Sequence, residues 1–197
     1  MSLLLADASP LIAFCEGSEH KLLMRVVTAA FGGRIFVPHH VDGEILRKVK
    51  MTGRANYQSM VSAETVCVYS EATLSGPYSD VFMSAIDLLD VSPAELHNKI
   101  KDGGEAFAVA HAQKLKRDGH SPVILMDDRG GRIWAQQGEI EICRTLQIFR
   151  LAKDLSLVQS FEEMDASFRA VMGHTVALTD NDLSALLVDL PRTSGRI

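Results

Sequence analysis

The stretch "PVILMDDRGGR", residues 122–132, is the starting point for interpreting this chain. Three β-favouring apolar residues at 123–125 lead through Met126 into two adjacent aspartates, Asp127 and Asp128. An apolar run of this length predicts a buried strand. Two neighbouring carboxylates at its end repel each other, and burying either one without a partner costs several kcal/mol. A bound metal ion would remove both costs, and so would a capping role.

Short apolar strands and helices alternate along the rest of the chain. Several helices carry a start or stop signal; for example, Ser9 is a candidate N-cap with Pro10 at the first helical position, and Gly32-Gly33 ends the next helix. Alternation of this kind indicates βαβ units and a parallel sheet with helices on both faces. The sequence therefore predicts an α/β fold, a three-layer α/β/α sandwich around a mainly parallel sheet. The strands are expected at 2–6, 34–38, 65–70, 122–126 and 139–143, and the helices at 9–16, 21–31, 39–50, 80–89, 92–100, 104–118, 132–138, 145–155, 161–172 and 179–190.

Acidic residues follow two of the expected strands. Asp7 comes directly after the first strand, and the Asp127–Asp128 pair follows the strand at 122–126. Active sites in parallel sheets form outside the carboxyl ends of the strands. These carboxylates are therefore expected to converge on one rim of the sheet.

Two glutamates join this group, although each has an ordinary structural explanation. Glu105 starts a helix after a Gly-Gly turn, where an acid is favourable without any function. Glu44 lies in an amphipathic helix and is spaced to pair with Lys48. Taken together with Asp7 and the aspartate pair, they suggest a cluster of hard oxygen ligands suited to Mg²⁺ or Mn²⁺.

Composition limits the possible functions. The 197 residues suit one good-sized domain, or a domain with a tail, and no apolar run approaches a membrane span. The beginning of the chain has no basic leader, and its three cysteines are scattered, so we expect a reducing, cytoplasmic location. The net charge of −5 argues against sequence-independent binding to nucleic acid.

Three kinds of site have little support. His39 and His40 have no histidine or cysteine at zinc-ligand spacing. The glycine pairs form neither GxGxxG nor a P-loop, so no nucleotide cofactor is expected. A haloacid-dehalogenase-like phosphatase needs a second aspartate two residues after the first, where this chain has Ser9.

Five segments resemble PIN domains, in the order in which that family carries them. Two of them depart from the usual pattern: Gly131-Arg132 stands where Ala-Arg is more common, and Arg144 stands where glycine is usual. The resemblance covers about residues 2–160. The segments are "LLADASPLIAF" (4–14), "VPHHVDGEIL" (37–46), "GGEAFAVAHA" (103–112), "VILMDDRGGRIWA" (123–135) and "CRTLQIFRLAKDLSLV" (143–158).

The resemblance implies a metal-dependent endoribonuclease of the VapC-like toxin kind. One or two divalent ions held by carboxylates activate water and relieve charge on the phosphoryl oxygens. Either Asp127 or Asp128 can be the direct ligand, and Asp128 is the better candidate if "MDD" matches the family's Thr-Asn-Asp ending. Ser9 either lies near the metal or phosphate or caps its helix. Arg129 and Arg132 either meet RNA phosphates or are ordinary solvated charges and counter-ions to the acids. The implied acidic site comprises Asp7, Glu44, Glu105, Asp127 and Asp128.

The resemblance also sets expectations about organisation and partners. Residues 1–160 would form the nuclease domain, and residues 161–197 a helical C-terminal extension that packs on the domain or on a second subunit. We expect RNA as substrate, a homodimer, and an antitoxin, if there is one, as a separate chain. The alternative is a PIN-like module that binds RNA or protein without cutting. The negative net charge and the two departures weigh against catalysis, whereas the intact set of four acid positions favours it.

Overall fold

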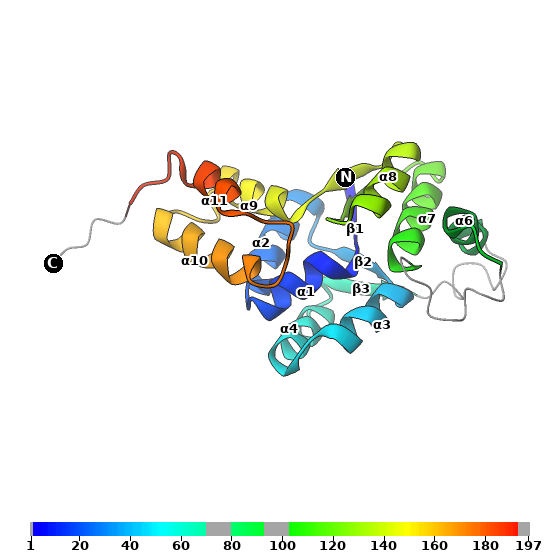
Figure 1. Cartoon of the computed structure of the whole chain (residues 1–197), viewed down its shortest axis with the longest axis horizontal. Coiled ribbons are helices and arrows are strands. Elements are labelled where there is room, and N and C mark those ends of the chain that lie inside the picture. Colours follow the sequence, from blue (N-terminus) through cyan, green and yellow to red (C-terminus); the bar gives the residue numbers. More distant parts are fainter. Residues whose placement is uncertain (1, 70–79, 93–102, 193–197) are drawn as a thin grey trace.

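The computed structural model describes residues 2–69, 80–92 and 103–192. In this part of the chain five strands form one sheet in the order β3-β2-β1-β4-β5, and every neighbouring pair is parallel. Helices cover both faces of the sheet (Figure 1), so the predicted three-layer α/β/α sandwich is confirmed. The strands are β1 (Ser2–Ala6), β2 (Ile35–Pro38), β3 (Val66–Tyr69), β4 (Ser121–Leu125) and β5 (Glu141–Cys143).

Helices connect the strands along the chain, and most of them lie where the sequence predicts a helix. In the first half of the chain they are α1 (Ala8–Glu16), α2 (His20–Phe31), α3 (His39–Lys48), α4 (Met51–Ser62) and α6 (Asp80–Leu89). In the second half they are α7 (Gly103–Arg117), α8 (Arg129–Gln137), α9 (Thr145–Asp154), α10 (Phe161–Met172) and α11 (Asp180–Leu187). None of these helices has the length and apolar character needed to span a bilayer.

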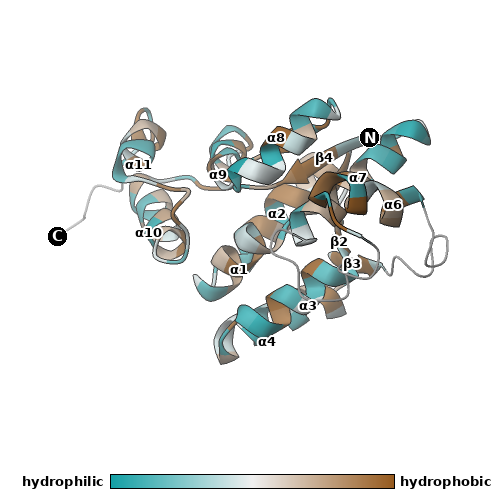
Figure 2. Ribbon diagram, turned by 45° about the vertical axis from the view of Figure 1, so that its right-hand side comes forward, coloured by the Kyte–Doolittle hydropathy of each residue, from teal (hydrophilic) through white to brown (hydrophobic). Residues whose placement is uncertain are grey.

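Alternate residues of the central strands supply the two halves of the core. Leu4 and Ala6 of β1 face α1, α2 and α9, whereas Leu5 faces α7 and α8. This is the period of two that a strand buried on both faces requires. Figure 2 shows largely apolar central strands between helices in which hydrophilic and hydrophobic residues are mixed.

The strand order places a topological switch point beside β1. The chain steps outward from β1 to β2 and β3, and then crosses to the other side of β1 to form β4. The Asp7 backbone N–H donates to the carbonyl of Leu125 at 3.0 Å, so the carboxyl ends of β1 and β4 are joined directly. Ligands bind at such a crevice in open α/β sheets.

The C-terminal helices pack into the main core. Met164 and Phe168 of α10 and Leu183 of α11 belong to the same buried cluster as Leu4. A Cβ on Gly17 would lie 2.7 Å from the carbonyl oxygen of Ala170, so α10 lies too close to the end of α1 for a side chain there. The division of the chain at residue 160 stays a prediction.

Two sequence-based expectations about helices need correction. Ser9 is not the N-cap of α1, because the Asp7 carboxylate accepts from the Ser9 backbone N–H and the helix begins at Ala8. The sequence also left α4 without an assignment, although its buried residues Tyr57 and Met60 lie three apart. The helix expected at 92–100 lies, apart from Ser92, outside the described residues.

Candidate active site

Three carboxylates gather where β1 ends and α7 begins. Asp7 follows β1 and is 1% exposed, Glu44 comes from α3, and Glu105 lies in the first turn of α7. Gly104 lies between them: a Cβ built there would be 3.1 Å from Glu44 Oε2 and 3.7 Å from Asp7 Oδ1. A larger residue would clash with these acids, so glycine at this position allows the start of α7 to lie in contact with them.

Asp7 is held in an unfavourable environment for a charge. Its Oδ1 atom is buried and has no hydrogen-bond partner. Burial, together with the negative charges of Glu105 and Glu44, raises the pKa of Asp7 to about 7, although hydrogen bonds from the backbone N–H groups of Ala8 and Ser9 lower it. The site is therefore short of positive charge at its most buried point.

Lys48 is a cation in contact with this group. Its Nζ atom pairs with Glu44 Oε1 one helical turn away, as the spacing predicted. The hydrogen bond to Glu44 raises the pKa of Lys48, against a smaller lowering by desolvation, and the charges of Glu44, Glu105 and Asp7 raise it further. Glu44 is thus both an ordinary i,i+4 partner and a member of the acid cluster.

The two aspartates after β4 have different partners. Asp127 accepts from the backbone N–H of Thr145 at 3.0 Å and from its hydroxyl at 2.5 Å, and lies 4.0 Å from Arg144 Nε. Asp128 is the N-cap of α8 and accepts from the Gly131 backbone N–H at 3.0 Å. Both carboxylates are therefore satisfied by the starts of the two helices that follow.

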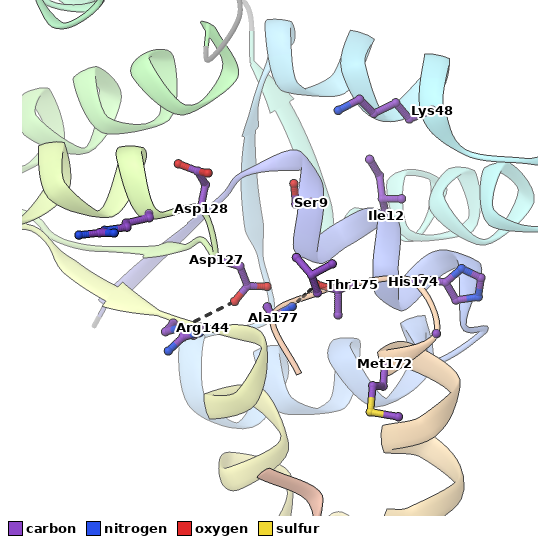
Figure 3. Close-up of a pocket in the computed structure, with 13 residues that line it drawn as sticks. Ser9, Ile12, Lys48, Asp127, Asp128, Arg144, Met172, His174, Thr175 and Ala177 are labelled. Carbon is purple, nitrogen blue, oxygen red and sulfur yellow. Dashed lines mark hydrogen bonds and ion pairs between the residues drawn. The ribbon is translucent and has the colours of Figure 1, made fainter. Parts of the chain in front are cut away.

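A cleft of about 900 Å³ lies beside these groups (Figure 3). Ser9, exposed on α1, lies in this view between Asp128 and Lys48, and its backbone N–H is 3.5 Å from Asp7 Oδ2. The cleft therefore reaches Ser9, whose backbone N–H contacts the buried Asp7. Its lining is Ser9, Ile12, Lys48, Asp127, Asp128, Arg129, Arg144 and residues 172–177.

The two arginines expected near substrate lie differently. Arg129 lines the cleft, whereas the Nε atom of Arg132 donates back to the carbonyl of Asp128 at 3.1 Å. Arg144, noted in the sequence only as a departure from glycine, lines the cleft and lies near Asp127. The sequence carried no signal that residues 172–177 would lie opposite Ser9.

Hard oxygen donors make the cluster chemically suited to a magnesium-like ion. The unpartnered Oδ1 of Asp7, with the Glu44 carboxylate close by across Gly104, fits such an ion. Within the described ranges, however, no three histidine, cysteine, aspartate or glutamate side chains are already arranged as a metal-binding group. Asp7, Glu44 and Glu105 are brought together, while Asp127 and Asp128 lie at the cleft with partners of their own.

The comparisons with known proteins agree with this architecture. A family model described as a PIN domain matches residues 3–177, which is most of the chain and includes α10 and the cleft segment after it. No curated protein matches the chain.

Proposed function

The chain belongs to the PIN-domain family, and we propose that it is an endoribonuclease that hydrolyses RNA phosphodiester bonds with Mg²⁺ or Mn²⁺. PIN domains have a nuclease-type fold and typically use divalent metal ions. The choice of RNA and of these ions goes beyond the family and is tested below.

The observation that carries the proposal is the state of Asp7. A carboxylate that is 1% exposed, has one oxygen without a hydrogen bond and lies near two further acids destabilises the fold. Such costs persist in proteins mainly where function requires them. A divalent cation would turn this repulsion into attraction.

The residues of the chain have distinct proposed roles. Asp7, Glu44 and Glu105 would hold the ion, with Asp128 or Asp127 completing its shell at the cleft. When bound, the ion supplies an activated water and neutralises charge on the phosphoryl oxygens. The Ser9 hydroxyl and the cations that line the cleft, Lys48, Arg129 and Arg144, would bind and orient the phosphates of the strand.

The test is cleavage of a mixed RNA pool with Mg²⁺ or Mn²⁺, with EDTA and Asp7→Asn as controls. We expect metal-dependent cutting that Asp7→Asn abolishes. Asp127→Asn and Asp128→Asn, compared at equal folded fraction, would identify which of the two aspartates binds the ion. Cutting that survives in EDTA or in Asp7→Asn would contradict the assigned site.

A second candidate function is a module that binds RNA or protein without cutting. It is favoured by the absence of a preformed metal-binding group in the described residues and by the existing partners of Asp127 and Asp128. Metal binding by calorimetry together with RNA binding, but with no cutting, would select this function.

The toxin role, the separate antitoxin and the homodimer are further parts of the proposal, supported by the resemblance to VapC-like toxins. Induced expression that arrests growth in the wild type but not in Asp7→Asn would support the toxin role. Light scattering after size exclusion would distinguish a dimer from a 21.6 kDa monomer.

A further inference from the structure

The segment after α10 forms one wall of the cleft. Residues 172–177 line it, although they are more than 160 residues from Ser9 in the sequence. In Figure 3 this segment passes below Ser9, with Thr175 and Ala177 toward Asp127 and the imidazole of His174 turned away from it.

The backbone of this wall is fixed at both ends. Val171 before it and Leu178 after it are buried in the main core. Inside the segment, the His174 N–H donates to the Val171 carbonyl at 2.9 Å, and the Ala177 N–H donates to the Thr175 hydroxyl at 3.1 Å. The wall is therefore a shaped part of the cleft.

Aromatic packing ties the same wall to the helix that carries Ser9. Phe14 of α1 stacks on Phe149 of α9 at 5.6 Å between ring centroids, and Phe149 contacts Phe168 of α10 at 5.0 Å. The close approach of α10 to Gly17 is a second link to α1. The distance between the wall and the acid cluster is thus set by the core.

Val176 is the unusual residue in this wall. It is 102% exposed, so no other side chain covers it, and yet it lines the cleft between residues anchored in the core. A branched apolar side chain held this way offers a surface for the apolar face of a bound group. The cations that line the cleft, Arg129, Arg144 and Lys48, outnumber its two carboxylates, which accept hydrogen bonds from helix starts, and this favours a polyanion as the bound molecule.

We propose that Val176 is a specificity-determining residue that contacts a base of the RNA strand whose phosphates are bound by the cleft cations. This inference rests on the proposed function, because it takes RNA as the molecule in the cleft. Contact through the side chain contributes to binding and to the choice of cutting site, while the acid cluster carries the chemistry.

The experiment measures the Kd of fluorescent single-stranded oligoribonucleotides in the Asp7→Asn protein with Mg²⁺, where cutting is blocked. Adding Val176→Ser should raise the Kd about three- to tenfold, because most of an aliphatic side chain loses its contact. Val176→Leu should retain the affinity. Val188→Ser is the matched control, since Val188 is 57% exposed on the same extension and does not line the cleft.

In the otherwise wild-type protein, Val176→Ser should raise KM, leave kcat nearly unchanged and alter the preferred cutting sites. Equal affinities for Val176→Ser and Val188→Ser, or no RNA binding at all, would overturn the inference. The wall would then be a surface for another partner, such as a protein. Absence of cutting by the wild type would overturn the proposed function, while the binding measurement still decides the role of Val176.

Discussion

The acids at the ends of β1 and β4 differ in how their charges are accommodated. Asp7 is buried, has an unpartnered oxygen and is repelled by Glu44 and Glu105. Asp127 and Asp128 accept hydrogen bonds from the starts of α9 and α8. The first group destabilises the metal-free protein, and the second pair stabilises it.

This difference shows that adjacent charged residues in a sequence need not be the residues that function requires. Two adjacent aspartates at the end of a strand suggest a functional site, but here hydrogen bonds from the starts of two helices account for both charges. The acids around the buried Asp7 are spread over residues 7, 44 and 105, where no two are neighbours. Variants of the two groups should therefore have opposite effects.

The largest effect is expected on cleavage in Glu105→Gln. Loss of an outer partner of a metal ligand typically costs 10–100-fold, so loss of a direct ligand should cost at least about a hundredfold in kcat/KM. Steady-state cleavage of one fixed RNA substrate with Mn²⁺ measures it, and Glu141→Gln, at an exposed glutamate on β5, is the control. Equal losses in the two variants would remove Glu105 from the site.

The next effect is a loss of stability in Asp127→Ala. This variant removes two hydrogen bonds to Thr145 and the nearby charge that faces Arg144, and it leaves the start of α9 without its acceptor. We expect the free energy of unfolding to fall by about 2–4 kcal/mol, measured by urea denaturation in EDTA. An unchanged midpoint would show that Asp127 is not a structural anchor.

Asp7→Asn should have the opposite effect on the free energy of unfolding in the metal-free protein. Replacing the repelled carboxylate by a neutral amide should raise the free energy of unfolding in EDTA at pH 8 by about 1–3 kcal/mol. Because the pKa of Asp7 is raised from 3.8 to about 7, the folded state takes up the proton first as pH falls. The wild type should therefore gain stability relative to Asp7→Asn between pH 7 and pH 4, and a constant difference across that range would contradict the assigned charge.

The sequence predicted the fold well because the signals for the strands are local. Apolar runs such as 122–126 and glycine stops such as Gly32 depend only on neighbouring residues, and the alternation of elements then favours a parallel sheet. Helix α4 was not predicted because its buried face is discontinuous, with Gly53 in place of an apolar residue in its first turn. Ser9 was assigned as the cap because Pro10 suited the first helical position, although aspartate is also a favoured N-cap and Asp7 has that role in the structure.

The candidate site was predictable only in part, for a physical reason. Strand topology and the family pattern brought Asp7, Glu44 and Glu105 together, since each lies at the end of a strand or within a helix at the same rim. The partners of Asp127 depend on the packing of α9, and the wall that contains Val176 depends on aromatic contacts among α1, α9 and α10. Contacts between segments so far apart leave no local periodicity in the sequence.

The smallest expected effect tests whether the cleft beside Asp127 and Asp128 faces the substrate. Arg129 lines the cleft, whereas Arg132, three residues later, bonds back to the carbonyl of Asp128. In the Asp7→Asn protein, Arg129→Gln should weaken RNA binding a few-fold and lower the slope of log Kd against log salt concentration by about one, because one phosphate contact is lost. Arg117→Gln, at the far end of α7, is the matched control and should change neither quantity. If Arg129→Gln leaves the salt dependence unchanged, the phosphates bind elsewhere. Asp127 and Asp128 would then only accept hydrogen bonds from the starts of α9 and α8.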